Sequence, residues 1–73
     1  MRVKIECMQI TVNGEKRELG ENLTIAEMLE ILKLPAERIA VELNREVVRK
    51  KDWESVRLND ADKIEIIHFV GGG

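Results

Sequence analysis

A two-residue hairpin near the start of the chain constrains the fold more than any other feature. Apolar and polar residues alternate over residues 8–12, which is typical of a strand with one buried face. Asn13-Gly14 follows at once, and this pair favours a tight turn between two antiparallel strands. We therefore expect a second strand over residues 15–19, where charged residues dominate and burial should be slight.

The seven residues before this hairpin leave two interpretations open. Val3, Ile5 and Cys7 alternate as well, but in the opposite phase to the strand that begins at Met8. Either a bulge lies near Cys7 and Met8, or residues 1–7 are a loosely held extension rather than the start of the first strand, and we favour the extension. The expected organisation is thus this segment, a domain over residues 8–70 and a glycine tail over residues 71–73.

A single helix is predicted after the hairpin. Thr24 and Glu27 have the spacing of a capping box, in which each side chain accepts a hydrogen bond from the other residue's backbone. Lys33 is expected in the last turn, and Pro35 prevents the helix from continuing. The apolar stripe of this helix comprises Ile25, Met28, Leu29 and Leu32.

The rest of the chain is predicted to be mostly strand. Strands are expected over residues 39–43, 46–49 and 63–70, with Trp53 packed as a plug beneath an irregular loop. The first and last strands are the most apolar, so they should lie centrally and pair in parallel. The fold class is therefore α+β, a mixed sheet of four to five strands with one main helix on one face.

Composition excludes several classes of protein. The 73 residues allow one domain, and no stretch is apolar enough to span a membrane. One cysteine and one histidine offer no metal-ligand spacing and no intrachain disulfide. The net charge of -2 and the two aromatic residues argue against nucleic-acid binding. No secretory signal is recognisable, so we expect a cytoplasmic protein.

The sequence ends in Gly71-Gly72-Gly73, which folding does not require. Three glycines form a slender arm that fits a narrow channel and presents the α-carboxylate of Gly73. A carboxylate with a pKa of about 3.3–3.7 is ionised at neutral pH and resists nucleophiles. It becomes useful only when a partner activates it, for example as an adenylate. The alternative is a disordered terminus.

The last strand suggests a docking patch beside the arm. Ile64 and Ile66 should face the core, so Ile67 and Phe69 should face the opposite side of the sheet. Exposed apolar residues just before the arm would suit a partner surface. A bulge that turns them inward, or ordinary apolar exposure, are the alternatives.

Other candidate sites have simpler explanations. His68 and Cys7 each stand alone, which favours a surface histidine and a small apolar residue. Asp60 and Asp62 lack the companions of a cation loop, so we interpret them as turn residues. The basic run 49–51 is interpreted as a solvated turn rather than a grip on an acidic partner.

The whole pattern resembles the β-grasp (ubiquitin-like) family of sulfur carriers. The resemblance rests on the hairpin, the helix that starts at Thr24, the segment 39–49, and residues 58–66 leading into glycines. It covers residues 8–73. The closing run Ile67-His68-Phe69-Val70-Gly71-Gly72-Gly73 is most similar to the ThiS branch, which serves thiamine thiazole synthesis.

The resemblance implies a protein cosubstrate rather than an enzyme. A ThiF-like (E1-like) adenylating enzyme would use ATP and magnesium to activate Gly73, and the carrier itself would bind no cofactor. A persulfide from a cysteine desulfurase or another donor would replace AMP and leave a thiocarboxylate, which a ThiG-like thiazole synthase would consume.

In this scheme three kinds of position have a role. Gly73 carries the covalent chemistry, and Gly71 and Gly72 pass through the partners' channels. Ile67, Phe69 and Val70 are our choice for contacts beside the arm.

Three alternatives remain at this stage. The chain could be a molybdopterin-synthase small subunit, a ubiquitin-like modifier joined to lysine amines, or a non-catalytic β-grasp interaction module. Ala61 departs from the resemblance because relatives often have glycine there, and we expect this to cost little if its backbone angles are ordinary.

Overall fold

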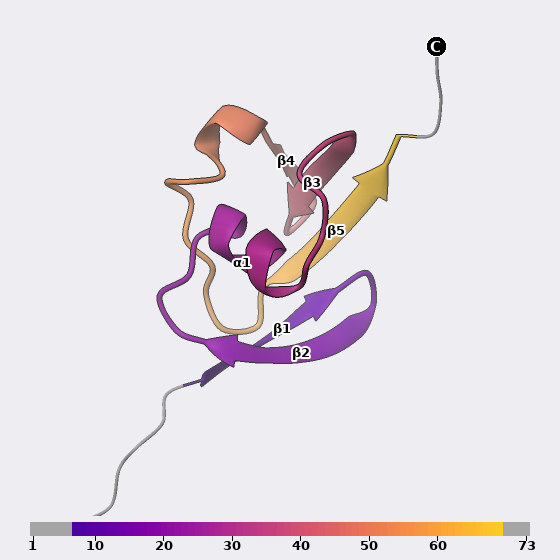
Figure 1. The fold of residues 1–73 in the computed structure, drawn as a ribbon. Helices are drawn as coiled ribbons and strands as arrows, with labels where there is room; N and C mark the ends of the chain where they lie inside the picture. The colour runs from indigo at the N-terminus through magenta and orange to yellow at the C-terminus, as the bar shows by residue number, and fades with distance from the viewer. Residues whose placement is uncertain (1–6, 70–73) are drawn as a thin grey trace, which may run out of the picture.

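The computed structural model describes residues 7–69, which form five strands and two short helices (Figure 1). No helix within this range is long and apolar enough to cross a membrane. The elements are β1 (Cys7–Val12), β2 (Glu15–Gly20), α1 (Ile25–Ile31), β3 (Ile39–Leu43), β4 (Glu46–Val48), the 3-10 helix η1 (Lys50–Asp52) and β5 (Lys63–His68).

The strands form one mixed sheet in the order β2-β1-β5-β3-β4. β1 and β5 pair in parallel inside the sheet, as expected, and the other neighbours are antiparallel. α1 lies across one face, which we call the inner face, and the opposite face is the outer face (Figure 1). The predicted α+β class with one helix on one face of the sheet is confirmed, with five strands.

The hairpin between β1 and β2 forms where the sequence predicts it. Asn13 and Gly14 have φ angles of 49° and 83°, which suit a tight turn whose two central residues are left-handed. Pairing between β1 and β2 is unbroken from Cys7 opposite Gly20 to Val12 opposite Glu15, so no bulge lies between Cys7 and Met8. Cys7 is therefore the first residue of β1 and not part of an extension, and residues 1–6 lie outside the described residues.

Helix α1 begins with the predicted capping box. The Glu27 amide donates to the Thr24 hydroxyl at 3.2 Å, and the Thr24 amide donates to the Glu27 carboxylate at 2.9 Å. Both bonds satisfy amides that the first turn of a helix leaves without partners. The capping box therefore fixes where the chain enters the helix layer.

The end of α1 differs from expectation at Lys33. The helix stops at Ile31, and Lys33 has a left-handed φ of 57°, so it does not lie in the last turn. The Lys33 amide donates to the Glu30 carbonyl at 3.1 Å and the Leu34 amide donates to the Leu29 carbonyl at 2.8 Å. This is a Schellman ending, which requires a left-handed residue after the cap.

The core lies between α1 and the inner face of the sheet. Trp53 is 4% exposed, and its indole donates to the Val48 carbonyl at 2.9 Å, so the predicted plug is confirmed. That bond satisfies the one polar group that the indole brings into the core. The other buried apolar residues are Met8, Ile10, Val12, Ile25, Met28, Leu29, Ile39, Val41, Leu58, Ile64 and Ile66.

Two turn asparagines hold β5 in place. The Asn13 side-chain oxygen accepts from the Ile66 amide at 2.7 Å, and the Asn44 side-chain oxygen accepts from the Lys63 amide at 2.9 Å. Asn44 also donates its side-chain amide to Asp62 at 3.0 Å. Both hairpin turns thus contribute side chains to the central strand, in addition to the backbone ladder.

Candidate functional site

The candidate site is the end of β5, from which the chain continues toward its glycines. Ile64 and Ile66 are buried, whereas Ile67 and Phe69 are 43% and 59% exposed on the outer face. The predicted orientation of these four residues is confirmed. Val70 and Gly71–Gly73 lie outside the described residues, so the roles assigned to them stay predictions.

Two residues from other strands extend this apolar surface. Ala40 of β3 is half-buried and lies directly opposite Ile67, and Val47 of β4 is 66% exposed on the same face. We call Ile67, Phe69, Ala40 and Val47 the outer apolar patch. The sequence did not reveal Val47, because Val47 and Val48 are adjacent and only the strand register decides which of them faces out.

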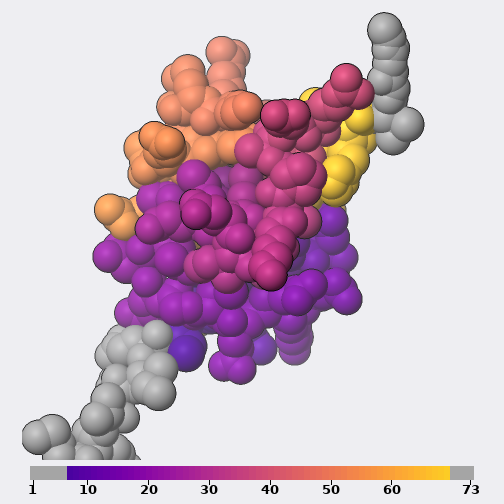
Figure 2. All heavy atoms as spheres, viewed as in Figure 1, coloured from indigo at the N-terminus to yellow at the C-terminus, as the bar shows by residue number. Residues whose placement is uncertain are grey.

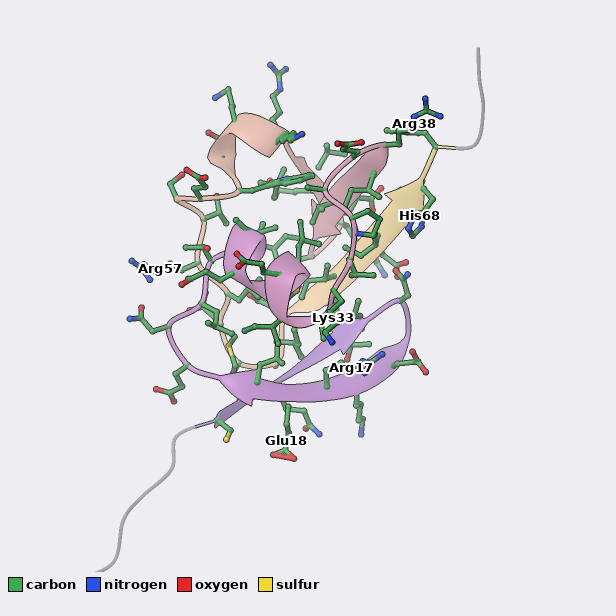
Figure 3. All side chains as sticks on the ribbon, viewed as in Figure 1. Arg17, Glu18, Lys33, Arg38, Arg57 and His68 are labelled. Atoms are coloured by element: carbon green, nitrogen blue, oxygen red, sulfur yellow. The ribbon has the colours of Figure 1, made fainter. Side chains whose placement is uncertain are left out.

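Backbone contacts fix the patch at the end of the sheet. The Phe69 amide donates to the Arg38 carbonyl at 2.8 Å, which extends the pairing between β3 and β5 by one residue past the ends of both strands. Arg38 has a left-handed φ of 59°. Figure 3 shows Arg38 and His68 both at this end of β5, with their side chains apart from each other, and Arg57 on the other side of the molecule. Arg38, opposite Phe69, therefore places a basic residue at the border of the patch, whereas His68 alternates with Ile67 and lies on the inner-face side of β5.

Acidic residues border Ala40 and Ile67 on the side away from Phe69. Glu42 and Glu65 lie opposite each other on β3 and β5, one step along the outer face from Ala40 and Ile67, and Val47 lies opposite Glu42 in the same row. An apolar centre with a charged border is the usual make-up of a surface that binds another protein. The helix-side view in Figure 2 shows β5 only as a yellow margin, whereas α1 fills the centre.

The weaker candidates have structural roles or stand alone. Asp60 accepts from the Gln9 amide at 2.7 Å, and Asp62 accepts from the Asn59 amide at 2.7 Å, which confirms them as turn residues. Lys51 contacts its neighbour Asp52 at 3.1 Å. Cys7 and His68 are exposed, and residues 7–69 contain no group of three or more potential metal ligands.

An open hollow lies near the start of β1 and carries no comparable arrangement. In it the Arg57 guanidinium donates to the Asn22 side-chain oxygen at 2.7 Å. The guanidinium is therefore already hydrogen-bonded within the chain, and nothing in the hollow points to a ligand. The hollow is lined by Met8, Glu21, Asn22, Arg57, Leu58, Asn59 and Asp60.

Comparison with known proteins decides the family. The model of the ThiS family matches residues 7–73, which is nearly the whole chain. The chain belongs to the ThiS family. The match includes both the outer apolar patch and the three final glycines, the two parts of the candidate site.

Similar proteins agree with this assignment. The sulfur carrier protein ThiS of Bacillus subtilis is 44% identical, over 88% of this chain and 98% of that protein. The crystal structure of a thiamine biosynthesis protein (ThiS) from Geobacter metallireducens is 38% identical, with a TM-score of 0.82 over 90% of this chain and all of that one. The second similarity confirms the β-grasp fold.

A third relative is much longer than this chain. A thiazole synthase of Paramagnetospirillum magneticum is 39% identical over 66 residues, which are 90% of this chain. The chain spans about a fifth of the length of that relative, since the matched part is 20% of it. A ThiS-like segment therefore occurs within a polypeptide that is named a thiazole synthase.

Proposed function

We propose that this ThiS-family sulfur carrier of thiamine biosynthesis carries its sulfur as a thiocarboxylate on Gly73 and delivers it for thiazole synthesis. The family match through Gly73 is the observation that carries the proposal. The chain acts as a protein cosubstrate, charged by one enzyme and discharged by another.

The chemistry follows from the reactivity of a carboxylate. A Gly73 carboxylate oxygen attacks the α-phosphorus of ATP and displaces pyrophosphate, which forms an acyl adenylate. A persulfide sulfur then attacks the carbonyl carbon and AMP leaves. A thiol reductant cleaves the sulfur–sulfur bond and releases the thiocarboxylate. Adenylation is needed because the free carboxylate is ionised at neutral pH and a poor electrophile.

The partners follow from these steps. A ThiF-like enzyme would bind ATP and magnesium for the first step, and a cysteine desulfurase or another donor would supply the persulfide. A thiazole synthase would take the sulfur, which the ThiS-like segment within a thiazole synthase supports. Because charging consumes ATP, we place the carrier in the cytoplasm.

The rest of the chain would present Gly73 to these enzymes. Gly71 and Gly72 lack β-carbons and so pass through a narrow channel at low steric cost. Ile67 and Phe69 would dock beside the channel entrance, together with Val70. Burial of apolar surface contributes about 25 cal/mol per Å², so this small patch adds affinity without making the complex permanent.

Intact-protein mass spectrometry tests the charging step. The purified chain is incubated with ATP, magnesium, a ThiF-like enzyme, a cysteine desulfurase, cysteine and a reducing thiol. We expect a gain in mass equal to the exchange of one oxygen for sulfur. The starting mass of the natural protein also checks that Gly73 is its last residue.

The matched control is a variant that lacks only Gly73, which leaves residues 7–69 unchanged. It should show no mass gain. Charging of the shortened chain at an equal rate would contradict the assigned role of Gly73. Covalent adducts with protein lysines in place of the sulfur gain would favour the modifier alternative, and sulfur transfer to a molybdopterin precursor alone would favour the molybdopterin branch.

A further inference from the structure

The hydrogen-bonding groups of β5 point alternately to its two neighbours. The Phe69 amide donates to Arg38 at 2.8 Å, and the Lys63 carbonyl accepts from the Asn44 amide at 2.7 Å, so the odd-numbered residues bond toward β3. The Ile64 carbonyl accepts from the Asn13 amide at 2.9 Å, so the even-numbered residues bond toward β1. The backbone groups that face β3 therefore belong to odd-numbered residues of β5, and those that face β1 belong to even-numbered residues.

The edge of β5 that faces β1 is paired over only part of its length. β1 ends at Val12, opposite Ile64, while β5 continues to His68. Figure 1 shows β5 running past the tip of the β1–β2 hairpin. The Asn13 side chain takes the next amide, that of Ile66. Beyond this bond, β1 offers β5 no further partner.

Two backbone groups of β5 remain open at this edge. Within residues 7–69, neither the Ile66 carbonyl nor the His68 amide has a hydrogen-bond partner. A strand edge with open donors and acceptors is a template for pairing with another extended segment.

We propose that an extended segment of thiazole synthase pairs with β5 at Ile66 and His68 when it receives the sulfur from the carrier. This inference rests on the proposed function. One extended residue of the enzyme satisfies both groups, because its amide donates to the Ile66 carbonyl while its carbonyl accepts from the His68 amide. The added strand fills the place that β1 leaves empty.

The position of this edge favours the sulfur-accepting enzyme over a second copy of the carrier. Two open groups are far too few for a stable dimer, which buries about 1,200–2,000 Å². An enzyme that also holds the C-terminal glycines binds next to the edge already. In strand addition the backbone bonds supply affinity and the alternate side chains supply specificity, and here those side chains are Ile67 and Phe69 of the outer apolar patch.

Amide hydrogen exchange of the full chain, free and bound to thiazole synthase, tests the pairing directly. In the free carrier the His68 amide should exchange rapidly, because no residue between 7 and 69 accepts from it, whereas the Phe69 amide should be protected by Arg38. In the complex we expect exchange at His68 to slow by at least about tenfold. Formation of the complex with His68 still exchanging rapidly would overturn the inference.

Paired variants of His68 separate the amide from the side chain. His68→Pro removes the amide donor, and proline is tolerated where the amide of an edge position faces solvent. His68→Ala removes the imidazole and keeps the amide. We expect His68→Pro to weaken binding about three- to tenfold, as loss of one hydrogen bond predicts, and His68→Ala to bind like the parent chain.

A check of folding keeps this comparison interpretable. Both variants should keep the circular dichroism spectrum of the parent chain, and exchange at Phe69 should stay slow in each. If His68→Ala and His68→Pro weaken binding equally, the imidazole is responsible and the inference fails. If His68→Pro unfolds the chain, the exchange measurement on the parent complex decides alone.

The two proposals fail in different ways. Charging of Gly73 together with an unprotected His68 amide in the complex overturns the strand pairing and leaves sulfur carriage intact. Protection at His68 without charging of Gly73 under any donor supports the pairing and overturns the proposed function.

Discussion

At the scale of single residues, Ala61 is the clearest departure from what the backbone prefers. Its φ is 71°, although the residue has a β-carbon, so the condition under which alanine would cost little here, ordinary backbone angles, is not met. The Ala61 amide donates to the Gln9 carbonyl at 2.7 Å. The carbonyl of the next residue, Asp62, accepts from the Thr11 amide at 3.0 Å. The tight join between β1 and the loop before β5 imposes this left-handed angle.

Ala61→Gly should therefore stabilise the protein. A left-handed residue with a β-carbon costs about 1–2 kcal/mol, which glycine would relieve. The greater conformational freedom of glycine in the unfolded chain offsets about 0.5–1 kcal/mol of this stabilisation. We expect a net increase of about 0.5–1 kcal/mol in the free energy of unfolding, measured by urea denaturation.

The reverse substitution in the first hairpin is the matched control. Gly14 has a φ of 83° with open space around it, so Gly14→Ala adds backbone strain without a clash. It should destabilise the protein by about 1 kcal/mol. A loss of stability in Ala61→Gly would show that the left-handed angle is not strained.

At the scale of elements, local sequence signals determined the beginnings of strands and of the helix well. Asn13-Gly14 and Thr24 with Glu27 specify their turns through bonds between near neighbours in sequence, and both form as predicted. The end of α1 was missed, because the Schellman bonds of Lys33 and Leu34 need no particular side chain. Signals carried by side chains are readable from sequence, and those carried by backbone alone are not.

The candidate site follows the same division. Alternation along β5 correctly predicted that Ile67 and Phe69 face out. Whether Val47 joins the outer apolar patch depends on the register between β3 and β4. The hydrogen bond between the Asn13 side chain and the Ile66 amide joins residues 53 positions apart in the sequence. No local pattern reports such long-range pairings, so these parts of the site required the structure.

Helix α1 offers a prediction at this scale. Thr24→Ala removes the hydroxyl that accepts from the Glu27 amide and should lower the free energy of unfolding by about 1 kcal/mol. Thr24→Ser keeps the hydroxyl and should retain most of that stability, as followed by thermal unfolding. Thr24 is 7% exposed as a residue. Equal losses of stability in the two variants would mean that its buried methyl group contributes more than the cap.

At the scale of the whole molecule, the two faces of the sheet differ in what covers them. The inner face packs against α1 and holds the core, whereas the outer face keeps the outer apolar patch exposed at the end of β5. A single helix on a five-stranded sheet leaves one face to solvent. The molecule is thus organised as a covered side for stability and an open side for contact.

Substituting two isoleucines of similar exposure, one on the outer face and one on α1, tests whether the outer face binds the partner. Ile67 is 43% exposed on the outer face, and Ile31 is 50% exposed on α1. Ile67→Ser should raise the KM for the carrier in the charging or sulfur-transfer reaction about three- to tenfold, because apolar contact with the partner is lost. Ile31→Ser should leave that KM unchanged. Equal effects of the two substitutions would contradict a docking role for the outer face.

The parallel pairing of β1 and β5 has a mechanical consequence. β1 begins at Cys7 and β5 ends at His68, at opposite ends of the paired strands. A force that pulls His68 away from Cys7 therefore acts along both strands. Their ladder bonds and the Asn13–Ile66 bond are then loaded in shear, all at once, instead of being unzipped one after another. A carrier pulled by its glycine end should yield only at high force.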